Sequence, residues 1–520
     1  MDPKSSDNSP KQRLTDLLKI ASVEDLSLDD AADHCGELID LSSDYEETAG
    51  LELAIDLLEE IIARCMASAE RAQLYYLEGN AWSSLDQIAD RSTESVWNWD
   101  RAKAEKALLA FRRAIKEPGF NDQPGIWRSM VYTNLGNTLD TIGRFVSSAS
   151  TYASAASADP TFGMPCVNRS ISLWHYAMNH YDASQKRILL WHANKQMTSA
   201  LRIALEPGVD EKGRKFLSQF ERVVGAKFLE APLDLEEYSL GATEDEVLYR
   251  RWCLENCLFL NPLNDCVAES IAAQDILHLP DMVRPVGEGP GFHGFFNQIK
   301  QEYASARFFL YESLNNDEVH FSDRDVMLVD ILDYASFGLA SGKARWAFRS
   351  AASIMDKIAV FLAWYFGLPN SARTDFRKVW YEKGKPEKGL RTEFTSRKNW
   401  PLRGLYWLSK DLYKTSICGE DLNPEVSQFR DIRNGLEHSY VKIQEFDPPS
   451  IEGDPTRDNH AVSVGRNRFE EMALQYLQHA REAIIYLSLG INQDQRQNKP
   501  VDGGIVLPTF LPEVDDDCKF

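Results

Sequence analysis

The stretch Tyr132-Thr-Asn-Leu-Gly-Asn-Thr-Leu-Asp-Thr-Ile-Gly-Arg-Phe145 decides how the first half of this chain folds. Gly136 lies inside a helix-forming run, where the missing side chain lets a second helix approach closely, and Gly143 suits the turn that follows. Tyr152 then supplies a large packing residue, and Pro160 stops the second helix. The sequence therefore predicts a pair of antiparallel helices spanning about 34 residues.

Looser copies of this unit lie on both sides of it. Residues 75–81 and 107–114 show the same small and large positions before it, and residues 169–183 show them after it. The spacing resembles the tetratricopeptide (TPR) repeat, whose helix pairs stack into a solenoid. The resemblance implies a helical solenoid over residues 51–245 that either binds a protein or ligand trigger or serves only as a scaffold.

The charge of the chain is strongly negative and unevenly distributed. Lys and Arg number 57 against 79 Asp and Glu, a net charge of −22, so bulk attraction to nucleic acid is excluded and any such site must be local. Residues 341–411 hold 15 Lys and Arg against 6 Asp and Glu, which leaves −31 for the rest. This segment either binds unpaired RNA, with its aromatic residues stacking on bases, or is simply a solvated basic face.

The second half contains long helix-forming runs with few breakers. Five helices are predicted, at residues 301–315, 325–366, 402–415, 424–442 and 468–491. Their antiparallel packing would give a helical bundle, so the predicted fold class is all-α. The predicted domains are 1–50 (a helical segment), 51–245 (repeats), 246–300 (a connector), 301–491 (the bundle) and 492–520 (a tail).

Neither a secretory leader nor a metal centre is expected. The chain starts with polar residues, and its longest apolar run, at 358–368, is too short to cross a bilayer, so we expect a soluble cytoplasmic protein without membrane contact. The eight cysteines are scattered, as is typical of reduced thiols. Cys253, Cys257 and Cys266 lie close together, but no closely spaced His pair follows them, which favours packing over zinc binding and predicts no metal or cofactor.

The most unusual polar residues lie in Phe429-Arg-Asp-Ile-Arg-Asn-Gly-Leu-Glu-His-Ser-Tyr440. Arg433, Asn434 and His438 read as R-N-x-x-x-H. Asn434 and His438, four residues apart, share one helix face, while Arg433 lies about 140° from the histidine and has a side chain long enough to swing round. The looser spacing Arg187-Ile-Leu-Leu-Trp-His192 also occurs, but its apolar filler indicates packing.

This motif on a late helix of a small all-α bundle resembles the HEPN superfamily. The runs 347–350, 354–359 and 405–411 resemble a bacterial branch of that superfamily in which TPR-type repeats precede the bundle. The resemblance implies a metal-independent endoribonuclease, a toxin or anti-phage defence effector regulated by its repeats, with RNA as the substrate.

The same resemblance implies roles for individual residues. His438 would carry a proton, since an imidazole has a pKa near ~6.5. Arg433 would grip the phosphate, and Asn434 would orient a partner or the scissile group. An acid and a base are both needed, and one bundle has one such histidine, so a homodimer with a composite site is implied. The predicted RNA contacts are Lys378, Lys398, Arg403 and Trp400.

Structural alternatives remain for each of these residues. Arg433 and Glu437 can form a surface ion pair, and Arg430 with Asn434 can do no more than interact locally. Asp356 is either a second polar residue of the site or half of an ion pair within the bundle. For the whole chain, the alternative is a non-catalytic adaptor whose bundle dimerises or binds a nucleotide.

Overall fold

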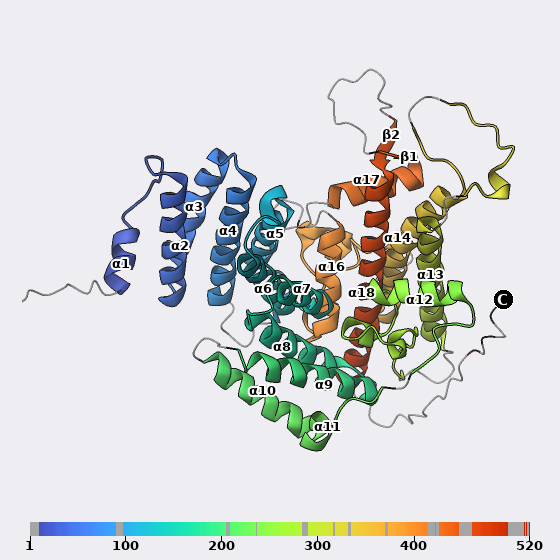
Figure 1. The fold of residues 1–520 in the computed structure, drawn as a ribbon, viewed down its shortest axis with the longest axis horizontal. Helices are drawn as coiled ribbons and strands as arrows, with labels where there is room; N and C mark the ends of the chain where they lie inside the picture. Colours follow the sequence, from blue (N-terminus) through green and yellow to red (C-terminus); the bar gives the residue numbers. More distant parts are fainter. Residues whose placement is uncertain are drawn as a thin grey trace, which may run out of the picture.

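The computed structural model describes residues 10–89, 97–203, 208–235, 237–282, 290–315, 318–330, 334–369, 373–413, 422, 426–446, 460–497, 514, 516 and 519. Over these residues the regular secondary structure is almost all helical, and the chain runs from a row of helices into a bundle (Figure 1). The predicted all-α class is confirmed. Most of the predicted tail, from residue 498 to 513, lies outside the described residues.

The first half forms a row of helices that resembles a solenoid. The helices are α1 (Pro10–Leu17), α2 (Leu28–Asp44), α3 (Thr48–Arg64), α4 (Ser68–Ala89), α5 (Ala102–Lys116), α6 (Gly125–Thr141), α7 (Phe145–Ala158), α8 (Met164–Asn179), α9 (Ala183–Ala200), α10 (Val209–Val224), α11 (Ala226–Glu230) and α12 (Glu244–Glu255). From α1 to α10, each helix packs against the next one along the chain. This is the arrangement expected of stacked helical hairpins.

Two glycines bring paired helices together. A Cβ atom at Gly136 would lie 2.5 Å from the ring of Tyr152, and one at Gly79 would lie 2.5 Å from the ring of Phe111. Each ring therefore occupies the space that a side chain on the facing helix would need. Gly143 has φ +93°, a backbone conformation that favours glycine, and it forms the turn between α6 and α7. The predicted roles of Gly136 and Gly143 are confirmed.

The second half is a bundle with a small sheet. Its elements are α13 (Gly291–Leu314), α14 (Leu339–Tyr365), α15 (Thr392–Thr395), α16 (Trp400–Leu412), α17 (Val426–His438), β1 (Tyr440–Gln444), β2 (Ala461–Gly465) and α18 (Arg466–Gln497). Helix α18 packs against α13, α14 and α16, and α17 packs on α14 and α16. In Figure 1, α16 lies between the N-terminal row and α18.

Four predicted helix boundaries are wrong by at least four residues, and one of them is the end of the last helix, which was predicted at residue 491 and lies at Gln497. The helix predicted from residue 325 begins at Leu339, after Gly338 with φ +120°. The helix predicted through residue 442 ends at His438, because the β-branched run that follows forms β1, which pairs in parallel with β2. Helix α13 begins at Gly291, inside the segment that was predicted to be a connector.

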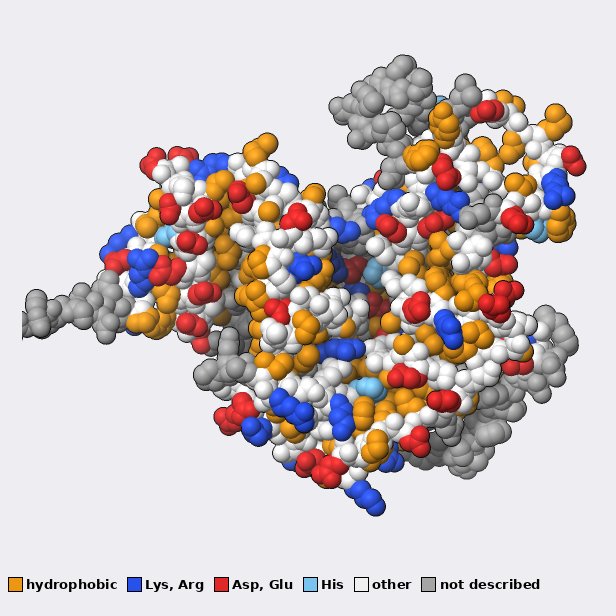
Figure 2. All heavy atoms as spheres, viewed as in Figure 1, with side chains coloured by type: hydrophobic (Ala, Val, Ile, Leu, Met, Phe, Trp, Pro, Cys, Tyr) orange, Lys and Arg blue, Asp and Glu red, His pale blue; other side chains and the backbone are white. Residues whose placement is uncertain are grey.

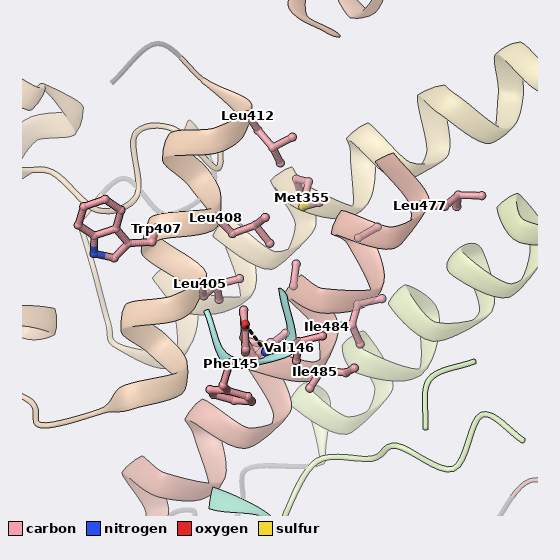
Figure 3. Close-up of a cluster of buried hydrophobic side chains, with 14 of the residues drawn as sticks. Phe145, Val146, Met355, Leu405, Trp407, Leu408, Leu412, Leu477, Ile484 and Ile485 are labelled. Atoms are coloured by element: carbon pink, nitrogen blue, oxygen red, sulfur yellow. Dashed lines mark hydrogen bonds between the residues drawn. The ribbon is translucent and has the colours of Figure 1, made fainter. Parts of the chain in front are cut away.

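The two halves share one hydrophobic core. A continuous cluster of buried side chains runs from α4 and α5 to α18, whereas α1 to α4 have a second, smaller core. Figure 3 shows Phe145 and Val146 of α7 among Leu405 of α16 and Ile485 of α18. The amide of Val146 donates to the hydroxyl of Tyr486, at 3.1 Å. The N-terminal helices are therefore packed into the bundle rather than tethered to it.

Backbone contact and buried charge hold this interface. A Cβ atom at Gly404 of α16 would overlap the carbonyl oxygen of Gly143. Beside that contact, Arg144 is bound between two carboxylates of the bundle, with Nη1 2.5 Å from Asp411 Oδ2 and Nε 2.8 Å from Glu482 Oε1. All three side chains are at least 96% buried, so none of these charges reaches bulk water.

Candidate functional site

Helix α17 carries the R-N-x-x-x-H motif and is held by aromatic packing. Phe429 and Ile432 are buried, and the ring of Phe429 lies 6.3 Å from Phe348 of α14 and 5.5 Å from Tyr476 of α18. At the other end, a Cβ atom at Gly435 would lie 2.8 Å from the side chain of Val441, so β1 folds back closely against the helix. These contacts fix which side of α17 faces the bundle.

Arg433 points into the bundle, where two side chains hold it. Its Nη2 lies 2.5 Å from Asp356 Oδ2 of α14, and its Nη1 donates to the hydroxyl of Tyr413 at 3.0 Å. Asp356 is itself fixed, because its Oδ1 accepts from the amide of Phe376 at 3.1 Å. Of the two interpretations of Asp356, the ion pair within the bundle is the one observed, and its partner is the motif arginine.

Burial and pairing act on these two charges in opposite ways. Burial raises the pKa of Asp356, and the attraction of Arg433 lowers it by less, so the pKa lies above its ordinary value. For Arg433, burial lowers the pKa, but Tyr413 and Asp356 more than offset this, so the guanidinium stays charged. Arg433 thus carries a fixed positive charge about a quarter exposed to solvent, with 27% of its side-chain surface accessible.

A second ion pair crosses the same two helices. Arg349 of α14 donates to both carboxylate oxygens of Glu437, at 3.0 and 3.3 Å. The alternative of a surface ion pair between Arg433 and Glu437 is not observed, since each has a partner on α14 instead. Arg430 also pairs elsewhere, with Asp431 at 3.3 Å, and not with Asn434. The two ion pairs join Arg349 to Glu437 and Asp356 to Arg433. Since residue numbers rise along α14 while those of the partners fall along α17, the two helices run antiparallel.

Asn434 and His438 face the other way, toward solvent. Both side chains are exposed, and His438 is the last residue of α17. Among the described residues, no hydrogen bond joins Arg433 to either of them. The structure thus places the three motif residues on one short helix but separates them into an anchored cation and two exposed polar groups.

One cation near the motif was missed in the sequence. Arg345 lies one turn before Arg349 on α14, and its Nη2 is 3.5 Å from the carbonyl oxygen of Val441, just beyond His438. No carboxylate of the described residues pairs with it, and burial alone lowers its pKa. A half-buried guanidinium without a counter-ion is costly, which is the property expected of a group that binds an anion. Its position beside the motif depends on how α14 packs against α17 and β1, so no sequence pattern could have identified it.

The predicted RNA contacts do not form one surface with the motif. Lys378 is exposed and near it, since Phe376 contacts Asp356, but Lys378 pairs with Asp375. Lys398 is exposed at the far end of α18, where its carbonyl accepts from Gln493 at 2.7 Å. That point lies 17 residues, or about 25 Å of helix, beyond Tyr476, which contacts α17.

Arg403 and Trp400 belong to the interface between the halves. Arg403 is fully buried, donates to the carbonyl of Thr141 and stacks 4.4 Å from the ring of Trp400. Trp400 in turn packs against Trp97 and His175. The burial of Arg403 contradicts the predicted contact with RNA, and the partly buried Trp400 packs against the N-terminal helices.

The basic character of residues 341–411 has the same structural explanation. Many of its cations have carboxylate partners, as Lys343 has in Glu312 and Lys410 in Glu105. Its aromatic residues Trp380, Tyr381 and Phe394 are buried, so they cannot stack on bases. On the face of the molecule drawn in Figure 2, acidic and basic side chains are interspersed.

The model of a protein family described as LA2681-like HEPN matches residues 284–494, from just before α13 to near the end of α18. This segment is a HEPN domain. The HEPN domain contains the whole motif together with Asp356, Tyr413 and Arg345. No curated protein and no solved structure gives a match to the chain.

Three further observations on the described part of the chain concern metal binding, the cysteine thiols and membrane-spanning helices. No group of three or more His, Cys, Asp or Glu side chains there is placed to hold a metal ion. Burial raises the pKa of Cys253 and of Cys266 to about 12, so both thiols stay protonated. None of the helices within the described ranges is both long and apolar enough to span a membrane.

Proposed function

We propose that this protein is a metal-independent endoribonuclease whose active site is completed where two HEPN domains meet. The observation that carries the proposal is the division of roles on α17. Arg433 is anchored by Asp356 and Tyr413, while Asn434 and His438 remain exposed on the same helix. Phosphodiester cleavage needs a positive charge to stabilise the transition state and a group that transfers protons, and a fixed cation beside an exposed imidazole supplies both.

In the proposed reaction, the ribose 2′-oxygen attacks the adjacent phosphorus and the bond to the 5′-oxygen breaks. One His438 accepts the proton of the 2′-hydroxyl, and the His438 of a second copy donates a proton to the departing 5′-oxygen. The products are a 2′,3′-cyclic phosphate and a 5′-hydroxyl. Arg433 and the unpaired Arg345 stabilise the added negative charge on the phosphorane.

The exposure of Asn434 and His438 supports a composite site. A single convex helix surface cannot enclose a phosphodiester or supply both an acid and a base. Two copies related by a two-fold axis would present two His438 side chains to one another. The N-terminal helices, packed into the same core, would then control how this surface is presented.

The test is cleavage of labelled, structured RNA by the full-length protein in EDTA. We expect wild-type protein to release 2′,3′-cyclic phosphate ends, and His438→Ala to lower the rate about 10³-fold, since proton transfer contributes about that much. His192→Ala is the matched control, because it removes the histidine of the other R-x-x-x-x-H spacing, outside the HEPN domain, and leaves the rate unchanged. Equal activity of wild type and His438→Ala would overturn the proposal.

Dimerisation is tested separately in the same preparation. Specific activity should fall on dilution in step with the dimer fraction measured by sedimentation. Full activity in a sample that sediments as monomer would contradict a composite site. Growth gives the cellular counterpart for a toxin or defence effector: expression should harm cells, and His438→Ala should relieve the harm.

One observation favours the non-catalytic alternative. Arg433 and Glu437 each form an ion pair with a residue of α14. Two of the four charged side chains of residues 430–437 therefore hold these helices together. As an adaptor, the protein would leave RNA intact, and Arg433→Met would change only its stability. The RNA assay above therefore separates the two functions.

A further inference from the structure

A residue of the N-terminal half binds both the end of α16 and a residue just before α17 in the sequence. Arg112 of α5 forms a bidentate pair with Asp411 at the end of α16, with nitrogen to oxygen distances of 2.7 and 2.8 Å. The Nη1 of the same guanidinium also donates to the carbonyl of Leu422, at 3.0 Å. One side chain thus joins the end of α16 to Leu422, four residues before α17 begins in the sequence, across about 300 positions of sequence.

This junction is buried and fully charged. Asp411 is 2% exposed and also binds Arg144, at 2.5 Å. Burial alone would raise the pKa of Asp411, but Arg112 and Arg144 lower it to about 2, so the carboxylate is ionised at every physiological pH. A carboxylate held by two guanidinium groups from the N-terminal helices is a rigid attachment point for the end of α16.

The attachment point lies two residues from the group that orients the motif arginine. Tyr413 follows Asp411 and Leu412, and its hydroxyl accepts from Arg433 Nη1 at 3.0 Å. Its ring also lies 6.4 Å from that of Phe376, whose amide binds Asp356. Tyr413, which binds Arg433 directly, and Phe376, which binds the other partner Asp356, therefore both lie next to the end of α16, where Arg112 binds.

We infer that Arg112 is a positioning residue for Arg433, and that through it the N-terminal helices set the geometry of the α17 site. Arg112 does not touch the substrate. It fixes Asp411, two residues before Tyr413, whose hydroxyl accepts from Arg433, and it also binds the carbonyl of Leu422, four residues before α17 begins in the sequence. The functional consequence rests on the proposed ribonuclease activity, whereas the structural coupling between α5 and α17 does not.

The experiment compares Arg112→Gln with Arg71→Gln in the full-length protein. Arg71 is a matched control because it also forms a bidentate pair, with Glu117 at 3.0 and 2.8 Å, within the hairpin of α4 and α5. Hydrogen exchange of residues 426–438 is measured by mass spectrometry. We expect Arg112→Gln to speed exchange there about tenfold, through loss of buried charged hydrogen bonds, and Arg71→Gln to leave it unchanged. Equal exchange in the two variants overturns the inference.

Kinetics provide the second readout. In Arg112→Gln, kcat for RNA should fall about tenfold with little change in KM, because a misplaced Arg433 weakens binding of the transition state rather than of the substrate. Arg112→Lys, which keeps one charged contact to Asp411, should restore part of the rate. In a Tyr413→Phe background, Arg112→Gln should have no further effect, and full additivity there would refute the route through Tyr413.

The two readouts separate the possible failures. If no variant cleaves RNA but exchange at α17 rises only in Arg112→Gln, the proposed function fails and the coupling stands. If cleavage depends on His438 but Arg112→Gln changes neither exchange nor kcat, the coupling fails and the function stands. If Arg112→Gln does not fold, Tyr413→Phe alone must lower kcat for the inference to hold.

Discussion

Two groups of ion pairs in this protein differ in burial and therefore in use. At the interface of the two halves, Arg144 shares two carboxylates and all three side chains are at least 96% buried. Between α14 and α17, the pair of Arg433 with Asp356 retains 27% and 31% of its side-chain surface exposed. A fully enclosed network can only hold structure, whereas a half-open pair has donors left for a ligand.

The strongest test of this difference removes one arginine from each group. Arg144→Met leaves Glu482 buried without its partner and should lower the free energy of unfolding by about 3 to 5 kcal/mol. Arg433→Met breaks a partly solvated pair and should cost about 1 kcal/mol. Urea unfolding monitored by circular dichroism measures both. Equal losses in the free energy of unfolding for Arg433→Met and Arg144→Met would contradict the difference between the two groups of ion pairs.

Acid titration sharpens the comparison, because the two aspartates shift in opposite directions. The folded pKa of Asp411, about 2, lies below the ~3.9 of an unfolded chain, so its contribution is present above pH ~4 and is lost as the pH falls toward 2. Burial raises the pKa of Asp356, so its contribution is present at low pH and is lost as the pH rises through the folded pKa.

Urea unfolding between pH 2 and 7 checks these signs. Asp411→Asn should flatten the acid limb of the stability profile by roughly 2 to 3 kcal/mol, because the carboxylate that favours folding above pH ~4 is then absent. Asp356→Asn should leave that limb in place. An Asp411→Asn protein that keeps the full acid dependence would show that its charge is not a determinant of the interface.

The smallest expected effect concerns Arg345, which lacks a carboxylate partner among the residues described. Arg345→Met should weaken RNA binding about tenfold and lower the salt slope of binding by about one, while the free energy of unfolding rises by up to about 1 kcal/mol. Lys398→Met, at the far end of α18, is the control and should leave affinity unchanged. Equal losses in both variants would indicate a diffuse basic surface instead of a site.

The sequence predicted local features of the fold better than distant contacts. Gly136, Gly143 and Tyr152 predicted a helical hairpin because their roles depend on neighbours within one repeat. The start of α14 was misplaced because the run from 325 is apolar enough for a helix, whereas the break depends on Gly338. The strand β1 was missed because it follows α17 directly and pairs with residues about 20 positions later.

The same distinction applies to the candidate site. The motif residues could be picked out by spacing alone, but their partners could not, since Asp356 and Tyr413 come from other elements. Arg403 looked like a surface cation in a basic segment and is buried, because its environment is supplied by Thr141 of the other half. Charge counted along the chain does not reveal which charges pair across it.

The contact of Gly143 with Gly404 has a consequence for how such a protein can change over generations. Neither position has room for even a methyl group, so the two backbone segments fit together only when both residues are glycine. A gene fusion that joined this bundle to other N-terminal helices would need a residue without a side chain at each of these two points. The two halves are therefore expected to be inherited as a unit, and a new specificity to arise on the outer helices α1 to α3, which lie apart from the shared core.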